Sequence, residues 1–196
     1  MAGPAGARVT KSVCVFCGSA PGARPIYSRA AEEMGFALAQ RGVTLVYGGG
    51  KLGLMGIVAD AVLAAGGRVV GVIPRMLIER ECAHPRLTRQ HVVDTMHERK
   101  TLMAEMSDAF VGLPGGMGTF DELVEIVTWA QLGLHAKPVV IANIDNYFAP
   151  MYAMLDHAVT EQFVTPVSRS RWRNADSVAH VMQILSEEGL AGEGIP

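Results

Sequence analysis

Two hydrophobic patterns alternate along the chain. Short runs that are apolar at nearly every position and rich in Val and Ile are typical of strands covered on both faces. Segments whose apolar residues recur with the helical period are typical of amphipathic helices. The first pattern predicts strands at residues 12–17, 44–47, 68–73, 109–113 and 139–142. The second predicts helices at residues 26–41, 54–65, 97–106, 119–132, 149–161 and 175–188.

Strand and helix succeed each other without an intervening linker, repeat or low-complexity run. This order predicts an α/β fold: a Rossmann-like parallel sheet joined by right-handed crossovers and flanked by helices on both faces. A length of 196 residues suits one well-buried core. We therefore expect a flexible leader at 1–11, a single catalytic domain at 12–188 and a flexible tail at 189–196.

The first four predicted strands all end in small or special residues. Gly18 and Ser19 follow the first strand, glycines 48–50 the second, Pro74 the third, and the run 114–116 the fourth. Because ligands of parallel sheets bind outside the carboxyl ends of the strands, this edge predicts the site. Ser19 is a candidate ligand contact on that ground.

The glycine run 48–53 matches the pattern G-x-G-x-x-G. A dinucleotide site also needs an acidic residue at the end of the next strand, and that strand ends instead in Val72-Ile73-Pro74-Arg75. The pattern therefore disfavours NAD. Two interpretations stay open: the run packs the next helix against the sheet, or Gly49 and Gly50 contact the substrate.

The segment Pro114-Gly115-Gly116-Met117-Gly118-Thr119 follows a strand and opens a helix. Glycines let the backbone approach a ligand closely, and the N–H groups and positive dipole end of a helix favour a phosphate. We expect Thr119 to cap the helix and to contact the same phosphate. A tight turn with a good cap would need one glycine at most, whereas this segment has three. We therefore interpret Gly115, Gly116, Gly118 and Thr119 as phosphate-binding residues.

Charged residues on two predicted helices complete the candidate site. Arg99 and Lys100 stand at the start of the first of these helices, where the helix dipole prefers acidic residues, and such a local conflict often marks function. Arg99 is the better anion ligand because its planar fork binds two oxygens, although an exposed basic turn is the alternative. Glu122 and Glu125 share one helix face. Only the first turn can face the ligand, so Glu122 is the catalytic candidate and Glu125 a supporting or solvated residue.

Composition excludes several classes of protein. A net charge of −2 leaves no electrostatic footprint for nucleic acid, and no apolar stretch is long enough for a bilayer. The six histidines show no metal-ligand spacing, so we expect no metal. Cys14 and Cys17 lie inside an apolar run, which favours core packing over redox or zinc chemistry. An odd number of three cysteines and the absence of a secretory core at the N-terminus indicate the cytoplasm.

Three separated motifs resemble one family. Residues 114–122 match P-G-G-x-G-T-x-x-E, and they are joined by Met96-His97-Glu98-Arg99-Lys100 and by the run 48–56. Together, in this order, they look like the LOG ("lonely guy") family of cytokinin riboside 5′-monophosphate phosphoribohydrolases, long labelled possible lysine decarboxylases. The likeness runs from residue 12 to residue 163.

The resemblance implies hydrolysis of the N-glycosidic bond of an N6-substituted adenosine 5′-monophosphate, with release of a cytokinin-type base and ribose 5-phosphate. It also implies a homodimer without a metal or redox cofactor. Carried over by position, the family's catalytic pair falls on Arg99 and Glu122. Its substrate contacts fall on Glu81, Lys100 and the turn 115–119.

Three alternatives remain open. A general AMP nucleosidase would share the site and lack a preference for an N6 substituent, and a nucleotide-sensing module would bind without turnover. A pyridoxal-phosphate lysine decarboxylase would need a Schiff-base lysine. The available lysines are Lys11, Lys51, Lys100 and Lys137.

Overall fold

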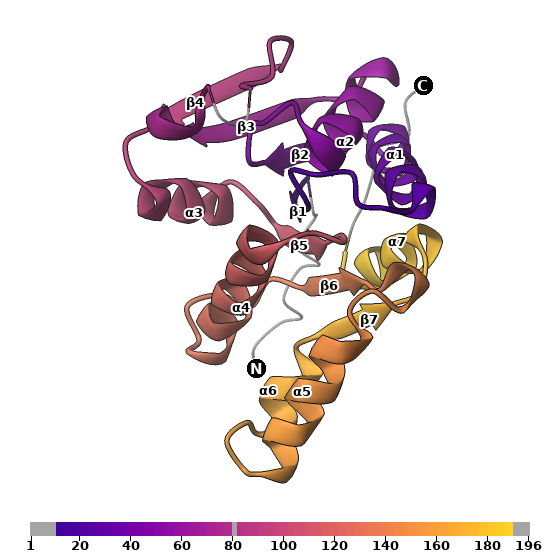
Figure 1. The fold of residues 1–196 in the computed structure, drawn as a ribbon, viewed down its shortest axis with the longest axis vertical. Coiled ribbons are helices and arrows are strands. Elements are labelled where there is room, and N and C mark those ends of the chain that lie inside the picture. Colours follow the sequence, from indigo (N-terminus) through magenta and orange to yellow (C-terminus); the bar gives the residue numbers. More distant parts are fainter. Residues whose placement is uncertain (1–10, 80–81, 190–196) are drawn as a thin grey trace, which may run out of the picture.

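One parallel sheet organises the part of the chain that the computed structural model describes, residues 11–79 and 82–189 (Figure 1). Its strand order is β4-β3-β2-β1-β5-β6-β7, and every neighbouring pair is parallel. The strands are β1 (Ser12–Phe16), β2 (Thr44–Tyr47), β3 (Val69–Pro74), β4 (Arg89–Val93), β5 (Ala109–Gly112), β6 (Val139–Ala142) and β7 (Arg173–Ala175).

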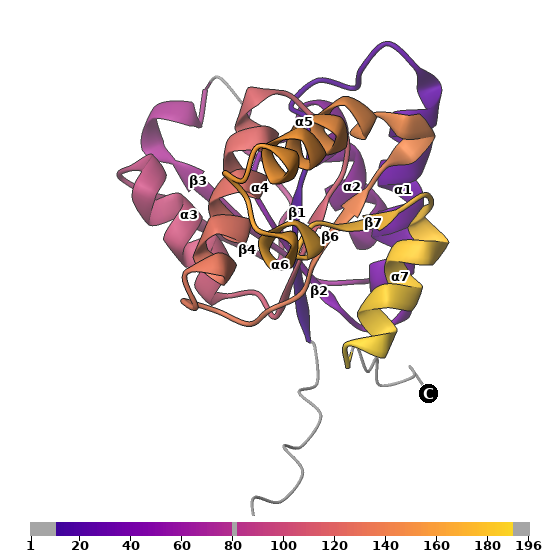
Figure 2. The ribbon, with the colours of Figure 1, turned by 90° about the horizontal axis from the view of Figure 1, so that it is seen from below.

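Helices cover both faces of this sheet, as Figure 2 shows. On one face lie α1 (Pro25–Gln40), α2 (Gly53–Ala64) and α7 (Val178–Glu187). The other face carries α3 (Met96–Glu105), α4 (Met117–Gln131) and α5 (Ala149–Thr160), with the short α6 (Pro166–Ser170) beyond them. Single 3-10 turns occupy Arg75–Leu77 and Ile144–Asn146. The predicted α/β architecture is therefore present.

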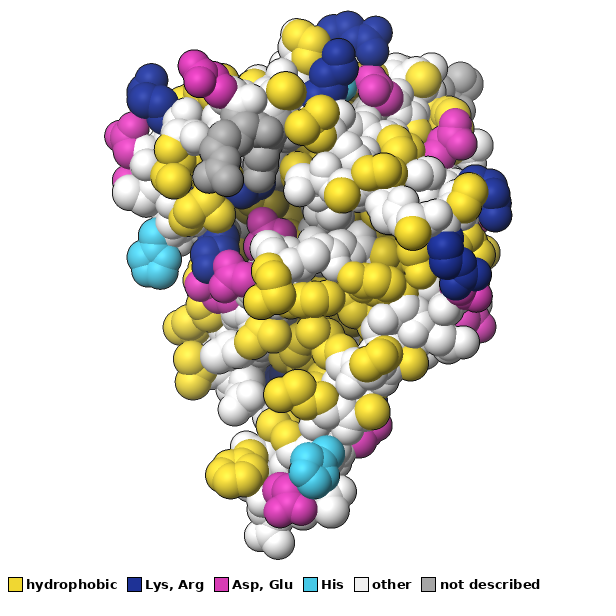
Figure 3. Space-filling model, viewed as in Figure 1, with side chains coloured by type: hydrophobic (Ala, Val, Ile, Leu, Met, Phe, Trp, Pro, Cys, Tyr) yellow, Lys and Arg dark blue, Asp and Glu magenta, His cyan; other side chains and the backbone are white. Residues whose placement is uncertain are grey.

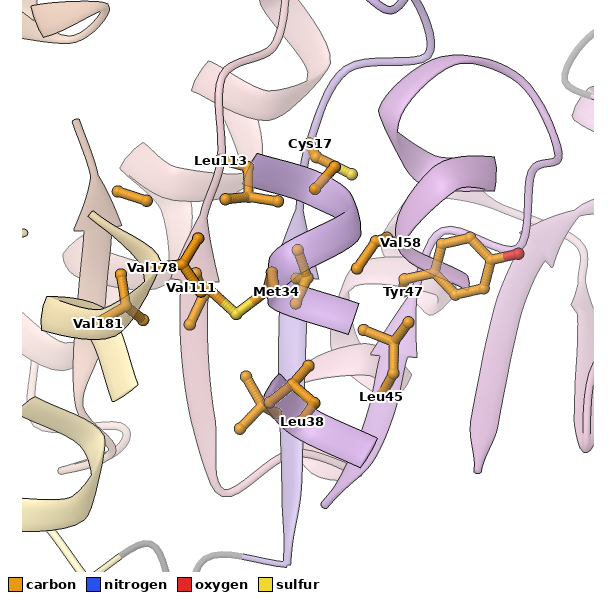
Figure 4. Close-up of a cluster of buried hydrophobic side chains, with 14 of the residues drawn as sticks. Cys17, Met34, Leu38, Leu45, Tyr47, Val58, Val111, Leu113, Val178 and Val181 are labelled. Atoms are coloured by element: carbon orange, nitrogen blue, oxygen red, sulfur yellow. The ribbon is translucent and has the colours of Figure 1, made fainter. Parts of the chain in front are cut away.

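Alternation along β1 divides the core in two. Val13 and Val15 join the cluster under α1, α2 and α7, whereas Cys14 and Phe16 join the cluster under α3, α4 and α5. Figure 4 shows the first cluster, in which Met34 of α1 packs between strand residues and α7. Apolar surface removed from water stabilises a fold by about 25 cal/mol per Å². Because the central strands are buried on both faces, they are firmly held, and they fix the positions of the loops that follow them.

The differences from the predicted elements lie at the margins of the sheet. All five predicted strands are present with ends shifted by a residue at most, but β4 and β7 were missed. Both are edge strands, and the sequence of β4, Arg-Gln-His-Val-Val, lacks the two-sided apolar pattern of a central strand. The helix predicted at 175–188 begins only at Val178, because Ala175 pairs with β6 and Ser177 caps the helix.

Within the described residues, no helix combines the length and the apolar character that crossing a membrane requires.

Candidate active site

Two loops meet at the carboxyl edge of the sheet, where the strand order reverses between β1 and β5. The Gly18 N–H donates to the carbonyl of Pro114 at 3.1 Å, so the turn after β1 is tied to the turn after β5. A side chain at Gly115 could not fit this junction, because its Cβ would lie 2.1 Å from Thr119 Oγ1 and 2.8 Å from Gly18 N. The glycine is therefore required by a close approach of two backbones.

Helix α4 begins at this junction with an open end. Its N-cap is Gly116, and no side chain caps it. The prediction that Thr119 caps the helix is wrong: Thr119 is the third helical residue and is buried. Since no side-chain oxygen occupies the cap, the first-turn N–H groups and the positive dipole end can face a ligand.

Two cavities flank the turn. The first, the polar cavity, has a volume of about 140 Å³. Its lining residues are Cys17, Ser19, Met55, Arg99, Gly116, Met117, Gly118, Thr119 and Glu122. The second, the tyrosine cavity, has a volume of about 250 Å³. It is lined by Gly18, Ser19, Ala20, Pro21, Gly22, Tyr27, Leu54, Pro114, Gly115, Gly116 and Tyr147. Ser19 of the loop after β1 and Gly116 of the loop after β5 line both, so the two cavities adjoin at this junction.

Arg99 reaches the polar cavity from the start of α3. Thr95 and Glu98 form a reciprocal capping box there, which fixes the first turn of the helix. Arg99 is buried, and its Nη2 donates to the carbonyl of Gly48 at 3.1 Å. A Cβ on Gly48 would lie 2.1 Å from that nitrogen. The glycine at the end of β2 therefore makes room for the guanidinium.

Glu122 enters the same cavity from α4, one turn after the open end. Burial raises the pKa of the Cys17 thiol, and the nearby charge of Glu122 raises it further. Burial and Glu122 likewise raise the pKa of Cys14. Both thiols therefore stay protonated and are poor nucleophiles, which leaves Glu122 and Arg99 as the charged groups of the cavity.

Lys100 follows Arg99 on α3, and its side chain forms ion pairs with residues of α4. Its Nζ lies 3.1 Å from Asp121 Oδ2 and 3.0 Å from Glu125 Oε2. Burial lowers the pKa of Lys100, but its hydrogen bonds to Glu125 and Asp121 outweigh that effect and raise the pKa overall. Lys100 therefore links α3 to α4, the helices that carry Arg99 and Glu122, and it lines neither cavity.

The structure places Gly49 and Gly50 against a neighbouring loop. The carbonyl of Gly49 accepts from the His84 N–H at 3.0 Å, and Gly50 forms a bridge with Ala83. Neither glycine lines the polar or the tyrosine cavity. Glu81, the remaining predicted contact, lies outside the described residues.

Sequence reasoning missed the residues that close the two cavities. Met55 lines the polar cavity, and Tyr27 and Tyr147 line the tyrosine cavity. Tyr147 could have been found, because it follows the fifth predicted strand at the same sheet edge as the four strand ends that were considered. No comparable signal distinguishes Met55 or Tyr27 from core residues. Within the described residues, no group of three His, Cys, Asp or Glu side chains could hold a metal ion.

The chain is similar in sequence to known proteins over most of its length. The family model described as possible lysine decarboxylase matches residues 55–185. The chain is 52% identical over 162 residues to the cytokinin riboside 5′-monophosphate phosphoribohydrolase of Rhodococcoides fascians, covering 82% of each chain. A protein of the same name from Arabidopsis thaliana is 45% identical over 177 residues, which cover 90% of this chain and 82% of that protein.

Solved structures share the fold at lower identity. The Moco carrier protein of Chlamydomonas reinhardtii superposes with a TM-score of 0.69 at 20% identity, covering 92% of this chain and 98% of that chain. The molybdenum cofactor binding protein of Rippkaea orientalis gives a TM-score of 0.64 at 18% identity, covering 90% and 94%. These likenesses concern the architecture of the sheet and its helices.

Proposed function

Because the chain belongs to the LOG family of cytokinin riboside 5′-monophosphate phosphoribohydrolases, we propose that it hydrolyses the N-glycosidic bond of an N6-substituted adenosine 5′-monophosphate. The products are the free cytokinin-type base and ribose 5-phosphate. One observation carries the proposal: Arg99 and Glu122 converge on the polar cavity at the open end of α4.

The substrate's 5′-phosphate binds at the open end of α4. Backbone N–H groups of residues 116–118 and the hydroxyl of Thr119 are suited to its oxygens, and the helix dipole favours its charge. The phosphate and Glu122 are both negative, and the positive charge of Arg99, which lines the same cavity, offsets their repulsion. Binding at this remote group orients the ribose, which supplies a large part of the barrier reduction.

Glu122 acts on the ribose. As the bond to the base breaks, its electron pair leaves with the base and positive charge develops at C1′ and the ring oxygen. A carboxylate beside these atoms stabilises the oxocarbenium-like transition state. Water then adds its oxygen to C1′, and its proton passes to the departing base through solvent or the site. Glu122 is half-buried, so its charge acts with little screening.

The lysine decarboxylase interpretation lacks a suitable lysine. A Schiff base needs an amine that reaches the reacting carbon. Lys100 is engaged by two carboxylates, and Lys137 donates to the carbonyl of Ala104. Lys11 and Lys51 are exposed. Neither cavity has a lysine among its lining residues.

A substrate panel tests the proposed reaction. The purified protein is incubated with AMP and with N6-isopentenyl-AMP, and free base and ribose 5-phosphate are quantified by chromatography. We expect equimolar products and a higher kcat/KM for the isopentenyl substrate. Equal kcat/KM values would instead indicate a general AMP nucleosidase. Tight binding without any free base would indicate a nucleotide-sensing module and would contradict hydrolysis.

We also propose that the protein is a homodimer. Helix α5 has no buried residue within this chain, and Met154 on it is 75% exposed. Phe163 and Val167 beyond it, and Val124 on α4, are exposed as well. Figure 3 shows hydrophobic side chains gathered over the region of α4 and α5. A second copy would cover such a surface. Sedimentation equilibrium tests this: Met154→Glu should yield monomers, and a monomeric unaltered protein would refute the proposal.

A cytoplasmic location completes the proposal. Cys14, Cys17 and Cys82 are all free thiols, and Cys82 is exposed. Exposed thiols persist in reducing compartments. Cell fractionation followed by thiol labelling would test this, and a protein recovered from an oxidising compartment would contradict it.

A further inference from the structure

Tyr147 contacts the turn that opens α4 from the tyrosine cavity, whereas Glu122 lines the polar cavity. Tyr147 lies just after β6, and its hydroxyl donates a hydrogen bond to the carbonyl of Gly115. It lines the tyrosine cavity and is absent from the lining of the polar cavity. Its partner Gly115 belongs to the turn that opens α4, so Tyr147 acts on that turn without facing the polar cavity.

The backbone before Tyr147 is held in an unfavourable conformation. Asp145 and Asn146 have φ values of 51° and 60°, in the left-handed region that residues with a Cβ rarely adopt. Such conformations cost about 1–3 kcal/mol each and persist only where the surroundings hold them. Arg24, at the start of α1, forms an ion pair with Asp145. The segment is therefore fixed in the shape that delivers Tyr147 to the turn.

The ring of Tyr147 is fixed as well. Its centroid lies 5.6 Å from that of Tyr27 and 4.9 Å from that of Phe148, both edge-to-face, and 6.5 Å from that of Phe120 in a stacked arrangement. Contacts of this kind are favourable for aromatic pairs. Three rings from α1, α4 and the β6–α5 loop thus hold the ring, and the hydroxyl has a defined direction.

The hydrogen bond from Tyr147 to the Gly115 carbonyl also sets the direction of the N–H of Gly116. In a trans peptide the C=O and the N–H point in opposite directions, and the described residues contain no cis peptide. When the Gly115 carbonyl is directed at Tyr147, the N–H of Gly116 in the same peptide is directed away from the tyrosine cavity. Gly116 also lines the polar cavity. A donor on the carbonyl further polarises the amide, which strengthens its N–H as a donor.

We propose that Tyr147 is a positioning residue for the anion site: its hydroxyl orients and polarises the Gly115–Gly116 peptide so that the Gly116 N–H binds the substrate's phosphate. This inference rests on the proposed function, since it assigns the phosphate to the polar cavity. When the hydroxyl is removed, Arg99 and the other donors of the turn still hold the phosphate and orient the ribose, so the binding that is lost is shared by ground state and transition state. Loss of the hydroxyl therefore raises KM and leaves kcat unchanged.

Tyr147→Phe tests the proposal, since it removes one oxygen and keeps the ring contacts. The measurements are KM and kcat for AMP, and the inhibition constant of inorganic phosphate as a competitive inhibitor. We expect both KM and the inhibition constant to rise by about three- to tenfold, because the variant loses one neutral hydrogen bond and leaves the Gly116 N–H a weaker, less well oriented donor. Tyr27→Phe is the matched control: it makes the same chemical change in the same cavity, and within the described residues the Tyr27 hydroxyl makes no hydrogen bond to the turn.

The outcomes separate positioning from a merely structural role. A parallel rise in KM and in the phosphate inhibition constant, with kcat and thermal stability unchanged and with Tyr27→Phe equal to the unaltered protein, supports the proposal. Unchanged constants in Tyr147→Phe would overturn it, as would a fall in kcat accompanied by a lower Tm. Lack of phosphate binding by the unaltered protein in calorimetry would also overturn it. Failure of the proposed function gives a different result: the protein binds phosphate in a way that depends on Tyr147, but it releases no base from the nucleotide.

Discussion

Gly48→Ala should inactivate the protein without altering any residue that we assign to catalysis. The new Cβ would lie 2.1 Å from Nη2 of Arg99 and 3.2 Å from Sδ of Met55. Non-bonded heavy atoms rest at about 3.5 Å, so the guanidinium has to retreat by more than about 1 Å. A displacement of about 1 Å in a catalytic group can reduce the rate about 100-fold. We expect that loss in kcat/KM.

Stability should change little, because the obstructed atom is the far end of a flexible side chain. The φ of Gly48 is not in the left-handed region, so alanine fits the backbone. Loss of the hydrogen bond to the Gly48 carbonyl costs about 1.5–3 kcal/mol at most, and replacing glycine returns about 0.4–1 kcal/mol through the unfolded chain. The Tm measured by calorimetry should therefore fall by a few degrees only.

A double-mutant cycle shows whether the effect passes through Arg99. If it does, adding Gly48→Ala to Arg99→Ala should cost no further activity, because the displaced group is already gone. The assay is chromatographic release of base from AMP by all four proteins. Additive losses in the double variant, or full activity of Gly48→Ala, would refute the role assigned to Arg99.

Three further predictions follow from contacts around the site. Lys100→Met removes the ion pairs that join α3 to α4, so urea denaturation should show a free energy of unfolding lower by about 1 kcal/mol, and an unchanged value would contradict the link. Gly115→Ala forces a Cβ against Thr119 and the backbone of Gly18, and we expect loss of AMP binding in calorimetry together with a lower Tm, whereas wild-type affinity would show that the close approach is not required. Burial lowers the pKa of His135, whose ring contacts the Ile126 carbonyl and the Lys137 N–H. The unfolded chain therefore binds this proton more readily, so stability should be full above pH 7.5 and should fall as the pH drops through about 6.5. His135→Gln should flatten that dependence in urea titrations between pH 5 and pH 8, and an unchanged profile would contradict the assignment.

The central sheet could be predicted because its strands are covered on both faces. Every position in β5 and β6 is buried, and such runs stand out in a sequence. The edge strand β4 has only half-buried and exposed residues, and β7 has only three residues, so neither carries that pattern. Their places are set by pairing with β3 and β6, which is tertiary information.

The candidate site could be predicted where the residue types conflict with local folding preference. Folding alone disfavours three glycines at the start of a helix, and it disfavours a basic pair there as well. These two conflicts predict the phosphate-binding turn and Arg99. The geometry then divides neighbours that look alike in sequence: Arg99 turns into the polar cavity, while Lys100 turns towards Asp121 and Glu125. The place of Tyr147 after β6 indicates the correct edge of the sheet, but its contact with Gly115 depends on the left-handed turn at Asp145 and Asn146, which the sequence pattern does not show.

The most direct test of the account compares the unaltered protein with Glu122→Gln on N6-isopentenyl-AMP. The amide keeps the size of the side chain and removes its negative charge, so binding of AMP should persist while the oxocarbenium-like state loses its partner. We predict equimolar base and ribose 5-phosphate from the unaltered protein and a kcat reduced by about 10²–10³ in Glu122→Gln. Release of both products by Glu122→Gln at the unaltered rate would contradict the central claim that this carboxylate, beside the phosphate-binding turn, drives the cleavage.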